Sequence, residues 1–273
     1  MLAFISIGLN DEKDMSIKAL EIAKSCDLLF AEFYTTKLNT TKEKLEKLIG
    51  KPIKILSRED LEERYQEILN EAKTKKVGLL VGGDCFIATT HLTIRLEAIK
   101  QGIETKVIHG SSIISAVAET GLHIYRFGQC ITIPFPERTK YKLPESVYDV
   151  IKSNKSRGLH TLCLLDLDVE NNKFMSVKEA IEILLSLEKK KREGVLNLDS
   201  KIVVFSRAGS ENSIILFDSI SKVVKKDIAL PAVIIIPGTL HFTEKEYLLA
   251  LLWGKPNYCT NNYYKYYYST NGY

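Results

Sequence analysis

The sequence predicts an α/β protein with two α/β domains and a ligand cleft between them. Short apolar runs alternate with amphipathic segments along the 273 residues, which is typical of α/β folds and favours largely parallel strands in the first half. Several runs end in glycine or small polar residues, at the strand ends where open sheets bind ligands. The run that ends at Val81 shows this most clearly, because Gly82-Gly83-Asp84 follows it and the pair Thr89-Thr90 opens a helical pattern.

Nine apolar runs have the length, the residue types and the bounding turn residues of strands. In order, they are Leu2–Ile7, Leu28–Phe30, Ile53–Leu56, Val77–Val81, Lys106–Ile108, Ile131–Pro134, Thr161–Leu165, Ile202–Ser206 and Val233–Ile236. A break near residues 109–125 predicts an N-terminal domain over residues 1–110 and a C-terminal domain over residues 111–256. Residues 257–273 hold seven of the thirteen tyrosines and are interpreted as a packed or disordered tail, or as an interaction segment.

Helices are expected between these strands, with recognisable signals at their ends. Three possible capping boxes mark helix starts: Thr40 with Glu43, Ser176 with Glu179, and Thr243 with Glu246. Three glycines stand where helices commonly end: Gly102, Gly158 and Gly194. The basic run from Lys189 to Arg192 is interpreted as a solvated last helical turn and not as a phosphate site.

The overall composition argues against nucleic-acid binding, a metal site and a membrane partner. Hydrophobic residues make up 45% and charged residues 26%, and the net charge of +4 is too mild and too interleaved to indicate nucleic-acid binding. The five cysteines lack CxxC pairs and the five histidines lack metal-ligand spacing, so we expect a reducing compartment, the cytoplasm, and no metal. No apolar stretch approaches a membrane span and no basic signal region opens the chain, so no membrane partner is expected.

Familiar cofactor and nucleophile motifs are missing. Neither Gly83 nor Gly110 leads into a Walker A motif, no GxGxxG follows the first predicted strand, and no GxSxG elbow occurs. The Gly82-Gly83-Asp84 turn can be a plain turn with an Asx-type bond from Asp84, or a loop that approaches a ligand. From the residues alone, both interpretations of this turn stay open, and the ligand cannot be identified.

A set of short strings resembles the diphthine synthase family, in the tetrapyrrole-methylase-like class of S-adenosylmethionine-dependent methyltransferases. The resemblance runs from Met1 to about Leu252, and Ala88-Thr-Thr-His91 and Gly121-Leu-His-Ile-Tyr125 are its most specific strings. The other matching strings are Ile7–Leu9, Ala31–Thr35, Leu56–Asp60, Gly83-Asp84, Val107–His109, Ser112-Ile113, Phe127-Gly128, Gly158–Thr161, Leu165-Asp166, Arg207–Ser210 and Ile236–Gly238.

This resemblance implies the class III methyltransferase fold, with the methyl donor in the interdomain cleft, and a homodimer. It implies methylation of the amino group of a 3-amino-3-carboxypropyl-histidine on translation elongation factor 2, three times, to give diphthine. Matching positions imply the donor contacts Leu9, Asp84, Ile87, Ser112, Ile113, Leu165, Ala208 and Ala232. No catalytic residue is assigned, since a neutral amine needs mainly orientation and exclusion of water; Asp84 is expected to orient the donor.

The chain also departs from the family pattern. Cys85 replaces the proline of the usual Gly-Asp-Pro, which predicts a looser loop with an unreactive thiol beside the ligand. Ala232 stands where relatives can carry histidine. The segment between Asp166 and Met175 is short, as in archaeal members, which favours three methyl transfers over the four of eukaryotic members.

Other polar residues and other functions remain open alternatives. Four residues in family-like strings either line an acceptor pocket or make structural hydrogen bonds: Glu32, Tyr34, His91 and His123. Arg207 either pairs with a substrate carboxylate or braces Asp166 or Asp168, the structural role being favoured. The competing functions are a tetrapyrrole carbon methyltransferase with a wider, arginine-lined pocket, a non-catalytic donor-binding protein, and a translation-associated module that binds no donor.

Overall fold

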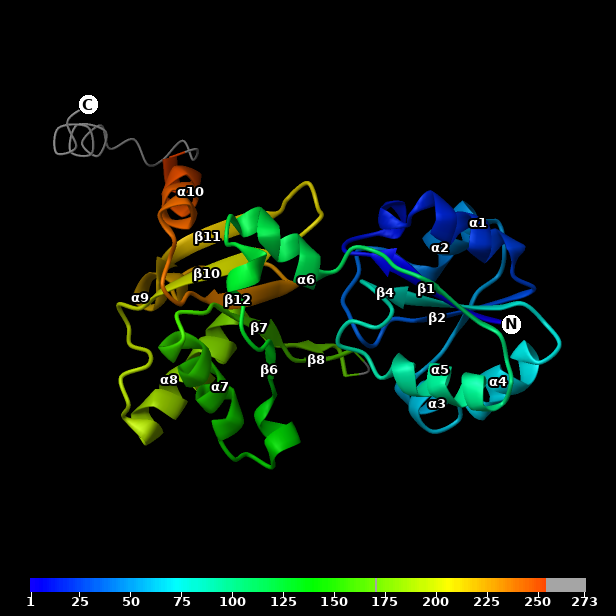
Figure 1. Ribbon diagram of the computed structural model, residues 1–273, viewed down its shortest axis with the longest axis horizontal. Helices are drawn as coiled ribbons and strands as arrows, with labels where there is room; N and C mark the ends of the chain where they lie inside the picture. The colour runs from blue at the N-terminus through cyan, green and yellow to red at the C-terminus, as the bar shows by residue number, and fades with distance from the viewer. Residues whose placement is uncertain (170, 254–273) are drawn as a thin grey trace.

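Two five-stranded sheets with helices on their faces form two α/β halves that lie side by side (Figure 1). The computed structural model describes residues 1–169 and 171–253. The tyrosine-rich segment over residues 257–273 lies outside the described residues. The predicted domain boundary between residues 110 and 111 falls in the loop between the last strand of the first sheet and the next helix, and it stays a prediction.

The N-terminal sheet is entirely parallel. Its strands run in the order β3 (Lys54–Ile55), β2 (Leu28–Glu32), β4 (Val77–Gly82), β1 (Leu2–Gly8) and β5 (Thr105–Ile108). All residues of β1 and β4 are buried, because helices cover both faces of the sheet, and such central strands read as continuous apolar runs. All five strands expected in this half are present, with ends shifted by one or two residues.

Two layers of helices sandwich this sheet, one on each face (Figure 1). One layer contains α1 (Ile17–Ser25) and α2 (Lys42–Ile49) beside the short η1 (Glu12–Asp14), and the other contains α3 (Arg58–Glu62), α4 (Gln66–Ala72) and α5 (His91–Lys100). Alternate residues of β1 enter different cores: Ala3 and Ile5 pack with α1 and α2, whereas Leu2 and Phe4 pack with the other layer.

The C-terminal sheet is mixed, with only β6 and β7 parallel. Its order is β11 (Ile214–Ser219), β10 (Lys201–Ser206), β12 (Ala232–Ile236), β7 (Thr161–Leu165) and β6 (Ile131–Ile133). The sequence interpretation omitted β11, although the apolar run from Ile214 to Phe217 was a usable signal. It also omitted the short hairpin of β8 (Leu167–Asp168) and β9 (Lys173–Phe174).

Helices cover this sheet on both faces as well. The helical segments are α6 (Ile113–Ala116), η2 (Val117–Thr120), η3 (Ile124–Arg126), η4 (Pro136–Thr139), α7 (Glu145–Ser156), α8 (Val177–Lys191), α9 (Ile220–Val223) and α10 (Phe242–Trp253). Buried residues of α7 and α8 form one core with the sheet, and Val117 and Leu248 form a second core on its other side. No helix within residues 1–169 and 171–253 is long and apolar enough to cross a bilayer.

Helix ends confirm some of the predicted signals and correct others. The Ser176–Glu179 capping box at the start of α8 is present, and the basic run does form the last turn of α8. The α2 helix is capped by Thr41 and not by Thr40, whose hydroxyl donates to Glu12 instead. The third prediction is wrong, because α10 already includes Thr243. Gly102 and Gly158 have positive φ just beyond the ends of α5 and α7, as expected. The α8 helix instead ends at Arg192, which itself has a positive φ, and Gly194 follows two residues later.

The two halves of the molecule contact each other at two places. The hairpin of β8 and β9 extends from the C-terminal sheet toward the N-terminal half (Figure 1). Val169 from this hairpin region packs against the N-terminal core, and the Lys37 ammonium lies 4.4 Å from the centroid of the Phe174 ring. Near the first strand, a Cβ built on Gly209 would lie 3.0 Å from the Leu9 Cβ.

Candidate active site

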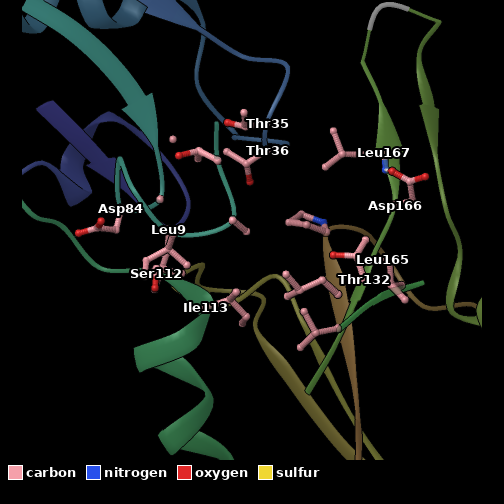
Figure 2. A pocket seen from close by; sticks show the side chains of 18 of the residues that line it. Leu9, Thr35, Thr36, Asp84, Ser112, Ile113, Thr132, Leu165, Asp166 and Leu167 are labelled. Carbon is pink, nitrogen blue, oxygen red and sulfur yellow. Dashed lines mark hydrogen bonds between the residues drawn. The ribbon is translucent and has the colours of Figure 1, made fainter. Parts of the chain in front are cut away.

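A cavity of about 300 Å³ lies between the two halves, at the carboxyl ends of β1, β4 and β5. That volume is within the usual range of small-molecule sites. All eight residues expected from the resemblance to contact a methyl donor line this one cavity: Leu9, Asp84, Ile87, Ser112, Ile113, Leu165, Ala208 and Ala232. Figure 2 labels five of them, Leu9, Asp84, Ser112, Ile113 and Leu165.

Glycines allow the loops of the N-terminal half to meet at the cavity. Gly8 and Gly83 exchange two backbone hydrogen bonds, of 3.1 and 2.8 Å, so the loops after β1 and β4 are tied together. Both glycines have positive φ, and a Cβ on Gly8 would lie 2.4 Å from the Asp14 Cβ. A Cβ on Gly110 would lie 2.6 Å from the Ser6 Cβ, so the loop after β5 also needs glycine to pack against β1.

The Asp84 carboxylate is used to hold these loops together. One oxygen accepts from the Phe86 N–H at 3.1 Å in an Asx-type bond, and the other accepts from the Gly110 N–H at 3.2 Å and lies 2.8 Å from His109 Nδ1. Burial by itself would raise the pKa of Asp84, but the hydrogen bonds from Phe86, His109 and Gly110 outweigh it and leave the pKa lowered. The two sequence readings of Asp84 are therefore compatible: it makes the local bond and also lines the cavity.

The other positions expected to contact the donor are small or apolar. Ser112 caps α6 by accepting from the Ile114 N–H at 3.2 Å. The next residue, Ile113, is half-buried and lines the cavity (Figure 2). Leu165 ends β7, and Ala232 opens β12 in register with Ser206. The C-terminal half thus lines the cavity mainly with apolar side chains, to which Thr132 and Asp166 add polar groups.

The structure corrects the expectation for Cys85. Its thiol does not lie beside the ligand cavity: the side chain is fully buried in the N-terminal core, and burial raises its pKa to about 11. The Cys85 N–H donates to Ser6 Oγ at 3.0 Å, a bond that a proline at this position could not make. The loop thus gains an anchor to β1 where the family pattern has a proline.

The expected brace from Arg207 to Asp166 is also wrong. Asp166 is instead held by Arg138, whose Nε lies 3.0 Å from its carboxylate, and by the N–H groups of Phe135 and Leu167. Arg207 has a positive φ of 52°, its N–H donates to Pro231, and it is absent from the described lining of the cavity. Sequence spacing could not choose between two arginines that are both distant from Asp166 along the chain.

A polar wall lies on the N-terminal side of the same cavity. It consists of Tyr34, Thr35, Thr36, Arg58, Glu62, Thr89 and Thr90. Of these, only Tyr34 was an explicit pocket candidate, although Thr35 and Arg58 lie in the matching strings Ala31–Thr35 and Leu56–Asp60. The Arg58 guanidinium lies 5.1 Å from the centroid of the Tyr34 ring, so α3 and the loop after β2 present these groups together.

Two other acceptor-pocket candidates, Glu32 and His91, lie fully buried behind this wall. Burial raises the pKa of Glu32 to about 7, against the hydrogen bonds from Thr35 and Tyr34 and the charge of Arg58. Burial lowers the pKa of His91 to about 4, so its imidazole is neutral at neutral pH. Neither residue lines the cavity directly.

His123 lies elsewhere, among hydrogen bonds at the start of α10. Its N–H donates to Glu244 at 2.8 Å and its Nε2 lies 3.2 Å from the Thr243 hydroxyl, at the start of α10. It does not line the described cavity. Within residues 1–169 and 171–253, no group of three or more His, Cys, Asp or Glu side chains is arranged to hold a metal ion.

Known proteins match this chain over nearly its whole length. Residues 1–224 match the family described as Tetrapyrrole (Corrin/Porphyrin) Methylases. The chain is 45% identical over 252 residues to the diphthine synthase of Methanocaldococcus jannaschii, a match that covers 91% of this chain and 97% of that protein. It is 46% identical over 258 residues to the diphthine synthase of Methanosarcina mazei, covering 92% of this chain and 96% of the other.

Solved structures agree with these sequence matches. A crystal structure of diphthine synthase superposes with a TM-score of 0.83 at 38% identity, covering 92% of this chain and 95% of the other. A putative diphthine synthase from Entamoeba histolytica superposes equally well, with a TM-score of 0.83 at 37% identity, covering 92% and 98% of the two chains. These matches confirm the predicted fold class and the resemblance. The chain therefore belongs to the diphthine synthase branch of the tetrapyrrole methylase family and is an S-adenosylmethionine-dependent methyltransferase.

Proposed function

We propose that this enzyme methylates the amino group of the 3-amino-3-carboxypropyl-histidine of translation elongation factor 2, three times, to give diphthine in diphthamide biosynthesis. The observation that carries the proposal is the arrangement of one cavity with two unlike walls. One wall contains the eight expected donor positions, and the other is polar and free for an acceptor. The names and high coverage of the relatives support the same reaction.

The donor wall fits S-adenosylmethionine, and we propose Leu9, Asp84, Ile87, Ser112, Ile113, Leu165, Ala208 and Ala232 as its contacts. The apolar and small side chains suit the faces of adenine and the edge of ribose. A Cβ built on Gly83 would meet nothing within 4 Å, so the loop backbone faces open space that a ligand can fill closely. Ala232, where relatives can carry histidine, is half-buried and lines the cavity with little bulk.

The acceptor wall suits an amino acid side chain. Arg58 is the single cationic side chain among the described residues that line the cavity, and it can receive the carboxylate of the aminocarboxypropyl group. The hydroxyl groups of Thr35, Thr36 and Thr90 can bind the neighbouring amine. A tetrapyrrole carbon as acceptor is less well supported, because that reading predicts a wider pocket with several arginines.

The chain's main contribution to the reaction is orientation. S-adenosylmethionine supplies, when bound, a methyl group on a positively charged sulfur. The loops tied by Gly8, Gly83 and Asp84 keep the donor wall in place. The acceptor wall then directs the neutral amine along the line of displacement. The short hairpin after Asp166 supports the three-methyl outcome, by its likeness to the short segment of archaeal members.

A methylation assay tests the proposal directly. Elongation factor 2 that bears the aminocarboxypropyl-histidine would be incubated with the enzyme and S-adenosylmethionine, and the modified peptide followed by mass spectrometry. Stepwise addition that stops at three methyl groups is expected. A fourth methyl would indicate the eukaryotic type of product. Donor binding without any transfer to this protein, but with transfer to a tetrapyrrole, would replace the proposed acceptor.

We also propose a homodimer, on the likeness to the family, and a location in the cytoplasm, on the five scattered cysteines without paired motifs. Sedimentation equilibrium of the purified full chain would measure its assembly state. A mass of twice the 30.9 kDa chain is expected, and a mass of one chain at micromolar concentration would contradict it.

A further inference from the structure

A buried carboxyl group behind the acceptor wall has no role in the reaction described so far. Glu32, at the end of β2, is fully buried. Its Oε2 accepts from the N–H groups of Tyr34 and Thr35, at 2.9 and 3.0 Å. Its Oε1 accepts from the Thr35 hydroxyl. Thr35 itself lines the cavity (Figure 2), so one residue both donates to the buried carboxyl group and borders the acceptor space.

Besides these three hydrogen bonds, the surroundings of Glu32 do little to stabilise its negative charge. His91, from α5, has its Nε2 4.0 Å from Glu32 Oε1, and neither of its ring nitrogens has a hydrogen-bond partner among the described residues. The imidazole is neutral at neutral pH, because burial lowers its pKa. Arg58, from α3, is the charged group that acts on Glu32 and lowers its pKa, and Tyr34 is the neighbouring titratable group on its own loop.

These surroundings leave Glu32 able to change its protonation state near neutral pH. Burial raises its pKa to about 7, and the three hydrogen bonds together with Arg58 only partly oppose this shift. A carboxyl group that titrates near the working pH is suited to proton transfer. An amine acceptor has a matching requirement, since it must be neutral before each attack on the methyl group.

We propose that Glu32 receives, through the hydroxyl group of Thr35, the proton that the acceptor amine must lose before each methyl transfer. This inference rests on the proposed function in one respect, that the acceptor is an amine. One N–H bond of the ammonium group breaks, and its electron pair stays on nitrogen. The proton joins Thr35 Oγ1, and the hydroxyl proton of Thr35 passes to Glu32 Oε1. After the transfer, Glu32 returns the proton by the same route to water.

Thr35 touches the acceptor in this scheme, whereas Glu32 is a positioning residue that acts through Thr35. The competing explanation is that Glu32 only holds the turn at Tyr34 and Thr35. The two explanations differ in their pH dependence. A lost structural bond lowers the rate at every pH, whereas a lost proton acceptor lowers it most where the amine is still protonated.

The first test is the pH dependence of single-turnover methyl transfer to modified elongation factor 2, with the donor saturating. The wild-type rate is expected to rise with pH and to show an inflection near neutrality. Glu32→Gln should lower the rate at pH 7 by about 100-fold and lose this inflection. At pH 9, where more of the amine is neutral by itself, the deficit should shrink to less than about tenfold. An equal deficit at all pH values would overturn the proposal.

Substitutions at Thr35 test the route itself. Thr35→Val removes the hydroxyl at nearly constant shape and should reproduce the Glu32→Gln profile, whereas Thr35→Ser keeps the hydroxyl and should restore the inflection. Thr36→Val is the matched control: this neighbouring threonine also lines the cavity but makes no described bond to Glu32. Its profile should keep the inflection whatever its rate. Loss of the inflection in Thr36→Val alone would overturn the assignment to Thr35.

A second measurement does not depend on the acceptor. Infrared difference spectroscopy of the full-length protein follows the C=O stretch of a protonated carboxyl group between pH 5 and pH 9. A band that is absent from Glu32→Gln should disappear with a midpoint near neutral pH. A Glu32 that stays ionised, or stays protonated, across this range cannot accept and return protons, and the relay would be wrong. If elongation factor 2 is not methylated at all, the proposed function fails and this spectrum still decides on the relay.

Discussion

At the scale of single residues, Asp84 shows how one carboxylate holds a binding loop. Asp84→Asn should weaken binding of S-adenosylmethionine at least about tenfold, because the amide nitrogen that replaces one oxygen cannot accept, so either the bond from Phe86 or those from Gly110 and His109 are lost. Isothermal titration calorimetry would measure the change. Asp168→Asn is the control, since that exposed carboxylate bonds only Asn171 among the described residues. Unchanged affinity with abolished transfer would reassign Asp84 to the chemical step.

A second prediction at the residue scale concerns His91 and the pH dependence of the free energy of unfolding. Its pKa is lowered from 6.5 to about 4 in the folded protein, so the unfolded chain binds more protons between those values. The free energy of unfolding should therefore fall as the pH drops from about 6.5 to about 4, by up to about 3 kcal/mol from this residue. His91→Phe should remove this part of the slope in urea titrations at a series of pH values. An unchanged slope would show that His91 is not the group that titrates.

At the scale of elements, the start of α10 depends on Glu244. Its carboxylate accepts from the N–H groups of His123 and His241, at 2.8 and 2.7 Å, and from His160 Nε2 at 3.1 Å, and it is fully buried. Glu244→Ala should lower the free energy of unfolding by more than about 2 kcal/mol, because it leaves buried donors without acceptors.

Glu246 supplies the matched control for that prediction, since it was the capping glutamate expected from the sequence. It is exposed, and Glu246→Ala should change the free energy of unfolding by less than about 0.5 kcal/mol. Chemical denaturation of the two variants would compare them directly. Equal effects would mean that the buried network contributes little to the stability of α10.

At the scale of the whole molecule, the cavity joins the two halves, so a ligand there stabilises both. A ligand at 100 times its Kd adds about 2.7 kcal/mol to the free energy of unfolding. S-adenosylhomocysteine should therefore raise the Tm of the wild type. Ala232→Phe should lose this rise, since the ring would fill space at the donor wall. Differential scanning calorimetry measures both, and Ala250→Phe on an exposed position of α10 should keep the rise.

The sequence by itself determined the α/β class, nine of the strands and the eight residues that meet at the cavity. Strand periodicity and glycine turns are local, so they can be read without the fold, and the donor positions came from likeness to a family. The short strings around Ala31 and Leu56 contained Thr35 and Arg58, but nothing local indicated that both would face the same cavity.

Only the tertiary structure decided which side chains are buried and which partners they meet. The Cys85 side chain lies in the core, and Asp166 pairs with Arg138 and not with Arg207. The residue that caps α10 is Glu244 and not Glu246. Each of these choices depends on segments far apart in sequence coming together, and on the cost of burying an unpaired polar group. The same cost sets the pKa of Glu32, which no spacing along the chain could predict.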